Sequence, residues 1–510
     1  MLGLESFRTP SAPKEAAHLV STLLDIVEEV APLPAGRRKD IRRDVLELWR
    51  ELTSEKSTRQ PDYIGEPAKL AAYLRYFLPW NVARLVPLLV DLDLGLKPGD
   101  AVLDIGSGPL TVPIALWIAR PDLRAMELRV ECMDRVRRAM EIGLGLLEGL
   151  ALRSGQALSW KLTIQKESFS ITDAAPRRDF ALVTSANVFN ESFWRIKGSL
   201  SERADMLASS LGARAARGGR ILIVEPGDPR SGAMLSALRE SVILRGGEPL
   251  APCPHRAACP MAGAFLSSAF RDSDEDGRDG GERLAKVVTA KGRSKAPWCH
   301  FVIDAGAAPE RLVAFSETAG LPKDRLIASW LLLRPDAAEK TPSAQAPSRS
   351  VRLVSDAFRL AEGGLGRYAC TRTGYSLVKD SLADLPSGTL ALLDAPVPPA
   401  STERDPKSNA VIVRAHSDQV APAQLPYKPP RTDRQGSRAA DGQTKGRDGK
   451  ARDHRQGSTK KPPITPRKAP RDDGGRFGRP SAQGPHPLAE RSPYARSKKN
   501  RNQRKPKRSS

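Results

Sequence analysis

Ala101-Val-Leu-Asp-Ile-Gly-Ser-Gly-Pro-Leu-Thr111 is the stretch that decides the fold. A short apolar run ends in a turn that contains Gly106 and Gly108, and an apolar segment of helical spacing follows at residues 111–119. A strand, a tight glycine turn and a helix are the opening unit of a nucleotide-binding α/β sheet. Leu110 stands where a third glycine often lies, which predicts a turn that is tighter against its ligand or does not bind one.

Two acidic residues suggest which ligand the turn would hold. Asp104 favours S-adenosylmethionine (SAM) over NAD, because a carboxylate here can hold the amino-acid end of SAM and would repel a pyrophosphate. Gly106 and Gly108 lack a Cβ, so their backbone can approach the ligand closely. Asp134 follows the second expected strand, about 20 residues or slightly more beyond the turn, where an acid meets ribose hydroxyls. A simple helix N-cap explains Asp134 equally well.

Strand and helix patterns alternate over residues 96–248, which predicts a parallel, doubly wound sheet with ligands at the carboxyl ends of its strands. The loop after the fourth strand contains Asn187, which we assign to the cofactor site, and then Asn190 and Glu191. This loop lacks the Asn/Asp-Pro-Pro-aromatic element that serves exocyclic amines, and it lacks a cysteine nucleophile, so no catalytic residue is assigned. The expected strands are 101–105, 128–133, 159–164, 180–184 and 220–224, and the main expected helices are 136–152 and 200–217.

The charge of the chain is unevenly spread. Residues 401–510 contain 28 lysines and arginines against 10 acidic residues, which is +18 of the total net charge of +22 and leaves +4 for the first 400 residues. Pro, Gly, Ser, Gln, Lys and Arg dominate from about Thr402 onward. This composition predicts a disordered basic tail over 401–510 that contacts RNA phosphates through 402–510, with a merely solubilising tail as the alternative.

Other features bound the class of protein. Five cysteines in 510 residues do not make a secreted disulfide scaffold. Residues 1–10 lack the pattern of a signal peptide, and no apolar segment reaches membrane-spanning length. We therefore expect a soluble, cytoplasmic protein without a membrane partner. Helical spacing in residues 15–55 and 67–93 predicts that residues 1–95 form a helical cap that precedes a sheet domain at 96–250.

Four of the cysteines are candidates for a metal centre. Cys253 and Cys259 lie in a proline-rich loop, Cys299 follows Trp298, and Cys370 follows in a later apolar run. Four thiolates can complete a zinc site or a 4Fe–4S cluster, and isolated buried cysteines are as good an explanation from spacing alone. His255 and His300 are alternative zinc ligands. We assign residues 251–400 to this metal-binding region, with a few short strands and an exposed insertion at 272–295.

The chain resembles the methyltransferase-like assembly factors of the small ribosomal subunit, a family that comprises a mitochondrial ribosome-associated protein and its bacterial relatives. The resemblance covers roughly residues 70–380 and implies a Rossmann-like SAM-binding domain. It also implies a 4Fe–4S cluster on Cys253, Cys259 and Cys299, with Cys370 matched through a looser spacing that ends at Gly374. The motifs that carry it are Leu103-Asp-Ile-Gly-Ser-Gly-Pro109, Val224-Glu-Pro-Gly227, Ala251-Pro-Cys-Pro-His255 with Cys259-Pro260, and Trp298-Cys-His-Phe301.

Three functions fit these observations. The first is a SAM-binding, methyltransferase-like protein that acts on small-subunit rRNA in ribosome assembly and carries the four-cysteine cluster. The second is a catalytically active, SAM-dependent rRNA methyltransferase. The third is a zinc-stabilised RNA-binding protein without SAM. The sequence favours the first, because its cofactor half is better supported than its catalytic half.

Overall fold

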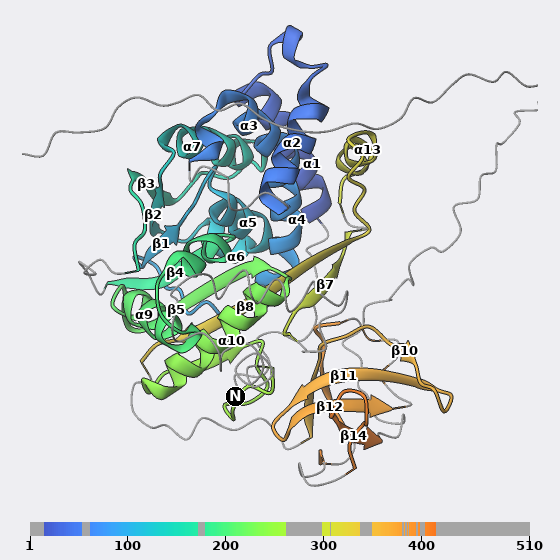
Figure 1. Ribbon diagram of the computed structural model, residues 1–510. Helices are drawn as coiled ribbons and strands as arrows, with labels where there is room; N and C mark the ends of the chain where they lie inside the picture. The colour runs from blue at the N-terminus through green and yellow to red at the C-terminus, as the bar shows by residue number, and fades with distance from the viewer. Residues whose placement is uncertain are drawn as a thin grey trace, which may run out of the picture. The chain divides into compact units, whose positions relative to one another are not determined.

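The computed structural model describes residues 15–53, 62–171, 179–261, 298–305, 308–336, 349–379, 382, 385, 387–393, 396–397 and 403–414. They form an α/β body around a large sheet, and a second, smaller β-sheet (Figure 1). The expected insertion at 272–295 and the tail beyond residue 414 lie outside the described residues. No helix in the described part of the chain is long and apolar enough to cross a lipid bilayer.

The large sheet has the strand order β3-β2-β1-β4-β5-β8-β6, and β7 pairs with β8. Strands β1 to β5 are parallel, whereas β8 runs antiparallel to β5, β6 and β7. The order reverses between β1 and β4, which is where open α/β sheets bind ligands. The strands are β1 (Ala101–Ile105), β2 (Leu128–Asp134), β3 (Trp160–Lys166), β4 (Phe180–Ala186), β5 (Ala215–Pro226), β6 (Glu248–Ala251), β7 (Phe301–Asp304) and β8 (Arg325–Arg334).

Helices cover both faces of this sheet (Figure 1). Val102 and Leu182 pack into one hydrophobic core, and their strand neighbours Leu103 and Val183 pack into the other, as the alternation of side chains along a strand requires. The doubly wound α/β sheet predicted from the sequence is therefore confirmed. Its helices are α5 (Thr111–Ala119), α6 (Pro121–Arg124), α7 (Arg137–Arg153), α8 (Phe189–Ser192), α9 (Leu200–Gly212) and α10 (Pro229–Leu244).

The N-terminal helices extend one of these layers. Helix α1 packs on α7, and α4 packs on α5, so their apolar side chains join the same core as that face of the sheet. The expected helices are present, but they are not a cap that merely precedes the sheet domain. They are α1 (Ala16–Val30), α2 (Ile41–Thr53), α3 (Pro67–Ala72) and α4 (Leu78–Leu89), with a π-helical turn at Tyr73–Phe77 and 3-10 turns at Ala35–Arg37 and Tyr63–Gly65.

The boundary expected at residue 250 is wrong. Strands β7 and β8 belong to the large sheet, where β8 lies between β5 and β6. Six consecutive residues of β8, 328–333, are buried, because a central strand needs cover on both faces. Helix α13 (Glu310–Thr318) connects β7 to β8 and packs near α4 through a hydrogen bond from Trp80 Nε1 to Ser316 Oγ (2.8 Å).

The second sheet has the order β13-β9-β11-β12-β14, with β10 paired to β11. Strand β14 pairs in parallel with β12, so the folded chain continues past the boundary at residue 400 that the basic composition suggested. Val411, Ile412 and Val413 are buried, and three apolar residues in a row are enough to complete a sheet edge. The strands are β9 (Ser350–Leu353), β10 (Phe358–Arg359), β11 (Leu365–Thr371), β12 (Gly374–Lys379), β13 (Leu390–Leu392) and β14 (Val411–Arg414).

Candidate functional site

The glycine turn after β1 has the shape that the sequence predicts. Gly106 and Gly108 both have positive φ angles, +69° and +52°. A Cβ on Gly106 would lie 2.2 Å from Val188 Cγ2, so this glycine admits the loop after β4. Only Ile64 Cδ1, at 4.0 Å, would lie near a Cβ on Gly108. Leu110, which stands where glycine-turn motifs often have a third glycine, adopts the left-handed conformation that favours glycine (φ +57°).

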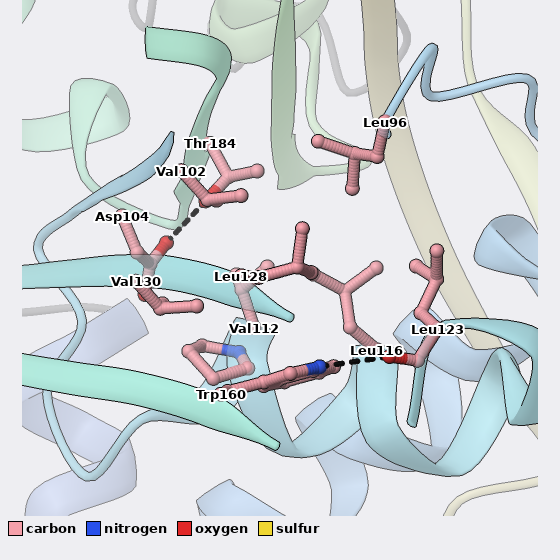
Figure 2. A pocket seen from close by; sticks show the side chains of 11 residues that line it. Leu96, Val102, Asp104, Val112, Leu116, Leu123, Leu128, Val130, Trp160 and Thr184 are labelled. Carbon is pink, nitrogen blue, oxygen red and sulfur yellow. Dashed lines mark hydrogen bonds between the residues drawn. The ribbon is translucent and has the colours of Figure 1, made fainter. Parts of the chain in front are cut away.

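Asp104 is held by protein groups. Its side chain is 1% exposed, and its oxygens accept hydrogen bonds from Thr184 Oγ1 (2.6 Å) and Ser107 Oγ (2.7 Å). Burial raises the pKa of its carboxyl to about 7. Figure 2 shows this carboxyl at the edge of a small, largely apolar cavity in the core beside α5. The carboxyl of Asp104 thus positions the glycine turn through Ser107, and direct contact of Asp104 with SAM stays a prediction.

Asp134 connects the end of β2 to the glycine turn. Its Oδ2 accepts a hydrogen bond from Gly108 N (2.9 Å), and its Oδ1 accepts one from Val136 N (2.8 Å). Burial raises the pKa of this carboxyl. The side chain is half-buried and lies at the carboxyl edge of the sheet, so Gly108 and Asp134 are brought together there. The second contact reaches Val136, which is itself the N-cap residue of α7, so Asp134 is not the N-cap of that helix.

The loop after β4 is held from two sides. Asn187 has φ +60°, and its Oδ1 accepts a hydrogen bond from Arg84 Nη2 (2.7 Å). The same guanidinium reaches Asn81 Oδ1 (3.2 Å) on α4. Glu225, at the end of β5, is fully buried and accepts hydrogen bonds from the backbone N–H groups of residues 188, 189 and 190 (3.2, 2.8 and 3.1 Å). Asn187 is thus engaged with protein groups.

The sequence did not identify Arg84 or Glu225 as site residues. Burial lowers the pKa of the Arg84 guanidinium, and the nearby Glu225 carboxylate raises it. Glu225 could have been found from the sequence, because it is an acidic residue of the Val224–Gly227 motif at the end of an expected strand. Arg84 lies more than 100 residues from Asn187 and has no local signal, because only the packing of α4 brings it to the site.

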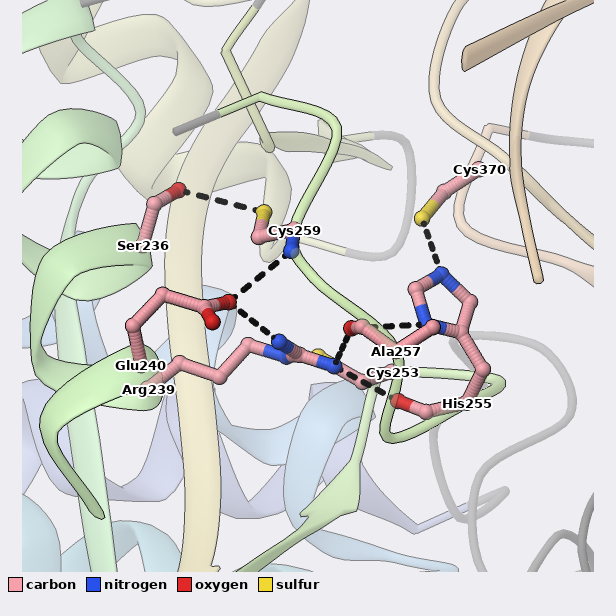
Figure 3. A network of polar contacts seen from close by, with 8 residues as sticks. All are labelled: Ser236, Arg239, Glu240, Cys253, His255, Ala257, Cys259 and Cys370. Carbon is pink, nitrogen blue, oxygen red and sulfur yellow. Dashed lines mark hydrogen bonds and ion pairs between the residues drawn. The ribbon is translucent and has the colours of Figure 1, made fainter. Parts of the chain in front are cut away.

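The four candidate cysteines line one cavity. Cys253 and Cys259 come from the loop after β6, Cys299 precedes β7, and Cys370 lies on β11 of the second sheet. His255 joins them through a contact of 3.3 Å between its Nε2 and Cys370 Sγ (Figure 3). His300 instead stacks on Trp298, with 4.7 Å between the ring centroids. The predicted grouping of segments more than 100 residues apart is thus present.

Two buried arginines, also missed from the sequence, accompany the thiols. Arg239 is 2% exposed; its Nε donates to Cys253 Sγ (3.3 Å), and its Nη2 donates to the carbonyls of His255 (2.7 Å) and Ala257 (2.8 Å) (Figure 3). Arg352 is 3% exposed, and its Nε donates to the carbonyl of Pro252 (2.8 Å). Burial lowers the pKa of Arg352 to about 10, against the effect of the neighbouring thiols.

The cavity suits thiolates only when a cation compensates them. Burial and the neighbouring sulfurs raise the pKa of Cys253, Cys299 and Cys370. In the part of the chain that the structure describes, no three His, Cys, Asp or Glu side chains converge as ligands of a single metal ion. A four-iron cluster needs no such convergence, because each of its cysteines binds a different iron atom.

Comparison with protein families identifies part of the chain. Residues 89–291 match the family model described as mitochondrial small ribosomal subunit Rsm22. This segment, about two fifths of the chain, is similar to the Rsm22 family. The match includes the glycine turn, Asp134, the loop after β4, Glu225 and the first two cysteines, so it covers both candidate sites in part. The resemblance read from the sequence motifs is therefore confirmed.

Solved structures similar to this chain include three methyltransferases. A TehB-like SAM-dependent methyltransferase from Corynebacterium glutamicum is 15% identical (TM-score 0.21; 39% of this chain, 82% of that one). Phosphoethanolamine N-methyltransferase 2 from Haemonchus contortus, in complex with SAM, is 13% identical (TM-score 0.25; 55% and 61%). A SAM-dependent O-methyltransferase from Thermotoga maritima is 16% identical (TM-score 0.19; 29% and 46%). No curated protein sequence matches significantly.

Proposed function

We propose that this Rsm22-family chain is a SAM-binding, methyltransferase-like protein that binds small-subunit rRNA during ribosome assembly, and that binding matters more than methyl transfer. The observation that carries the proposal is the state of the loop after β4. The Asn187 side chain and the backbone N–H groups of 188–190 are bound by the protein itself, through Arg84 and Glu225 respectively. The described side chains of this loop include no free acid or base that could act on a substrate, whereas catalysis requires a reacting group in place.

The SAM half of the proposal is supported by the carboxyl edge of β1, β2 and β4. The backbone of Gly106 and Gly108 would approach the cofactor, and the half-buried Asp134 carboxylate would accept hydrogen bonds from its ribose hydroxyls. Asn187 would line the same space, with Asp104 as a positioning residue behind the turn. SAM, when bound, supplies a methyl group activated on a sulfonium.

The cysteine centre is proposed to hold a 4Fe–4S cluster. Cys253, Cys259, Cys299 and Cys370 would each ligate one iron, and the cluster would supply the charge that keeps four buried thiolates stable. Arg239 and Arg352 fit this group, because an iron–sulfur cluster on four thiolates carries net negative charge and both guanidiniums are buried beside it. Zinc on the same thiolates, with His255 in reserve, is the alternative.

One observation favours the enzyme as a second candidate. The carboxamide oxygen of Asn190 is buried and accepts no hydrogen bond from any described residue. It could orient an exocyclic amine of a base next to a bound cofactor. This is the group that an active rRNA methyltransferase would use.

On this proposal, the protein is located in the same compartment as the ribosome whose small subunit it binds. The matched family is named for the mitochondrial small subunit, and the expectation of a cytoplasmic protein stays a prediction. Binding of RNA by the tail also stays a prediction, because residues 415–510 lie outside the described residues.

Cells that carry matched glycine variants separate the two functions. Gly108→Asn keeps a residue that tolerates φ +52° and fills the space where the cofactor would lie, and Gly155→Asn makes the same change at φ +63° with nothing within 4 Å. We expect deletion of the gene to accumulate immature small subunits, Gly108→Asn to be much milder, and Gly155→Asn to be silent. A full deletion defect in Gly108→Asn cells, together with loss of one specific rRNA methyl group, would establish the enzyme instead.

A further inference from the structure

We propose that one face of the second sheet binds single-stranded RNA by stacking bases on a row of three aromatic rings, Phe358, Tyr368 and Tyr375. The proposal rests on the function above, since it takes rRNA as the partner, and it names the surface that contacts it. The rings come from three adjacent strands, β10, β11 and β12, which lie next to one another in Figure 1.

The three rings form a continuous row. The ring centroids of Phe358 and Tyr368 are 5.0 Å apart at 36°, and those of Tyr368 and Tyr375 are 4.9 Å apart at 17°. Cross-strand aromatic pairs also stabilise sheets without binding anything. What distinguishes this row is that all three side chains are only half-buried, so it is not the core of the sheet.

The register places the row on the face away from the hydrophobic core. Tyr375 lies opposite Cys370, and Phe358 lies opposite Gly366, so all three rings share the face of Cys370. The other face supplies Val351, Ala369 and Val378 to the core of this sheet. The aromatic row therefore lies beside Cys370, whose Sγ contacts His255 Nε2 (3.3 Å) in the loop after β6.

The polar groups of the row are available to a ligand. Neither tyrosine hydroxyl has a hydrogen-bond partner among the described residues, although Tyr368 N is bound by Ser355 Oγ (2.9 Å). Two hydroxyls that keep their donors and acceptors can pair with base edges. Because Tyr368 lies between the other two rings, bases would extend the stack from the outer faces of Phe358 and Tyr375.

Charge around the row suits a phosphate backbone. Residues 349–379 and 403–414 contain nine lysines and arginines against four acidic residues, and seven of these nine basic residues are not buried. Glu362 and Glu403 are paired with Lys379 and Arg414. Arg372 and Lys407 are exposed and form no ion pair with any described residue, so they are free to contact phosphates. The exposed Arg359 alternates with Phe358 on β10 and belongs to the other face of the sheet.

These features together fit single-stranded RNA. Proteins that bind single strands combine aromatic stacking platforms with nearby cations, whereas double-stranded RNA keeps its bases stacked on one another and is recognised by shape. A ribosomal protein segment is the competing partner, and the experiment distinguishes it.

The test measures the affinity of the full-length chain for a fluorescent ten-nucleotide RNA of mixed sequence, at a salt concentration that suppresses the tail. Tyr368→Leu with Tyr375→Leu removes two rings but keeps apolar bulk, and Tyr375→Phe keeps the ring as a matched control. Stacking is worth about 1–3 kcal/mol per base, so we expect binding weakened roughly fivefold or more per lost ring. Tyr375→Phe should stay within about threefold. Thermal melting and the visible absorbance of the cluster report on folding.

Co-sedimentation with immature small subunits separates the possible failures. If the double variant binds the RNA as tightly as the wild type, the aromatic surface is wrong while the proposed function stands. If it loses only the subunit and keeps the RNA, the partner is a protein and the inference is overturned. If the wild type binds neither, the proposed function fails. Should the double variant unfold, photocrosslinks from 5-bromouridine RNA to the wild type must map to these rings, and crosslinks confined elsewhere contradict the proposal.

Discussion

Two regions of the molecule are built in opposite ways. The first is the proposed cofactor face, formed by the glycine turn at 106–108 with Asp104 and Asp134. The second is the cysteine centre, formed by Cys253, Cys259, Cys299 and Cys370. At the cofactor face, Asp104 and Asp134 find their hydrogen bonds on near neighbours in the same sheet, so the turn is complete without a ligand. At the cysteine centre, thiols from distant segments share a cavity with Arg239 and Arg352, and the carboxylate that pairs with the buried Arg239 is the partly exposed Glu240. From this comparison we expect the first region to fold without a ligand, and the second to depend on the cluster that we propose for it.

The largest expected effect is therefore at the cysteines. Cys253→Ser should abolish bound iron and lower the free energy of unfolding by about 3–5 kcal/mol. Loss of the negatively charged cluster would leave the positive charge of the buried Arg352 uncompensated. Cys132→Ser is the control, since Cys132 is buried in the large sheet and outside the cavity. Iron and sulfide analysis after anaerobic purification, with visible spectra, measures the difference. Stoichiometric zinc without iron would leave a zinc site in place of the cluster.

A second change tests how the loop of Cys253 is held. Arg239→Met removes charge-assisted hydrogen bonds to the carbonyls of His255 and Ala257 together with the ion pair to Glu240, and should therefore cost about 2–4 kcal/mol. Arg245→Met, near the end of the same helix and half-exposed in its pair with Asp205, should cost less than about 1 kcal/mol. Urea unfolding followed by circular dichroism gives both values. Equal losses would mean that Arg239 contributes no more than a surface ion pair.

The third prediction concerns pH at the cofactor face. Burial raises the pKa of Asp104 from 3.8 to about 7. Between these values the folded state binds more protons than the unfolded state, so the free energy of unfolding falls as pH rises through this window, by up to about 4 kcal/mol. Asp104→Asn lacks this titration, and the Ser107 and Thr184 hydroxyls can rotate to fit it. The variant should gain stability relative to the wild type from pH 5 to pH 8; a constant difference would contradict the raised pKa.

Sequence patterns and structure agree where interactions are local. All five expected strands of the parallel sheet are present. A short apolar run followed by a turn, as in β1, predicts a strand without any knowledge of its tertiary contacts. Arg84 and Arg239 were missed because their partners lie far away in the sequence. Strand β14 was missed because Val411–Val413 is short and sits in a basic composition, and β8 was assigned to the wrong region because pairing partners cannot be read from an apolar run.

The smallest expected effect on stability is that of the tail. A chain that ends at Arg414 keeps β14, so its melting temperature should stay within about 2 °C of the full chain. Its affinity for RNA should depend less steeply on salt, since fewer phosphates are neutralised. A chain that ends at residue 401 also loses β14 and should melt clearly lower. An unchanged salt slope after removal of 415–510 would make the tail a solubiliser only.

Co-sedimentation of the full-length chain with immature small subunits tests the central claim most directly, because it compares both regions in one assay. We predict that Gly108→Asn, which blocks the cofactor face, binds the subunits within about twofold of the wild type and of Gly155→Asn. Cys253→Ser should bind at least tenfold more weakly, while Cys132→Ser should bind normally. If Gly108→Asn instead loses binding while Cys253→Ser keeps it, the cofactor face and not the cysteine centre supports rRNA binding, and the account is wrong.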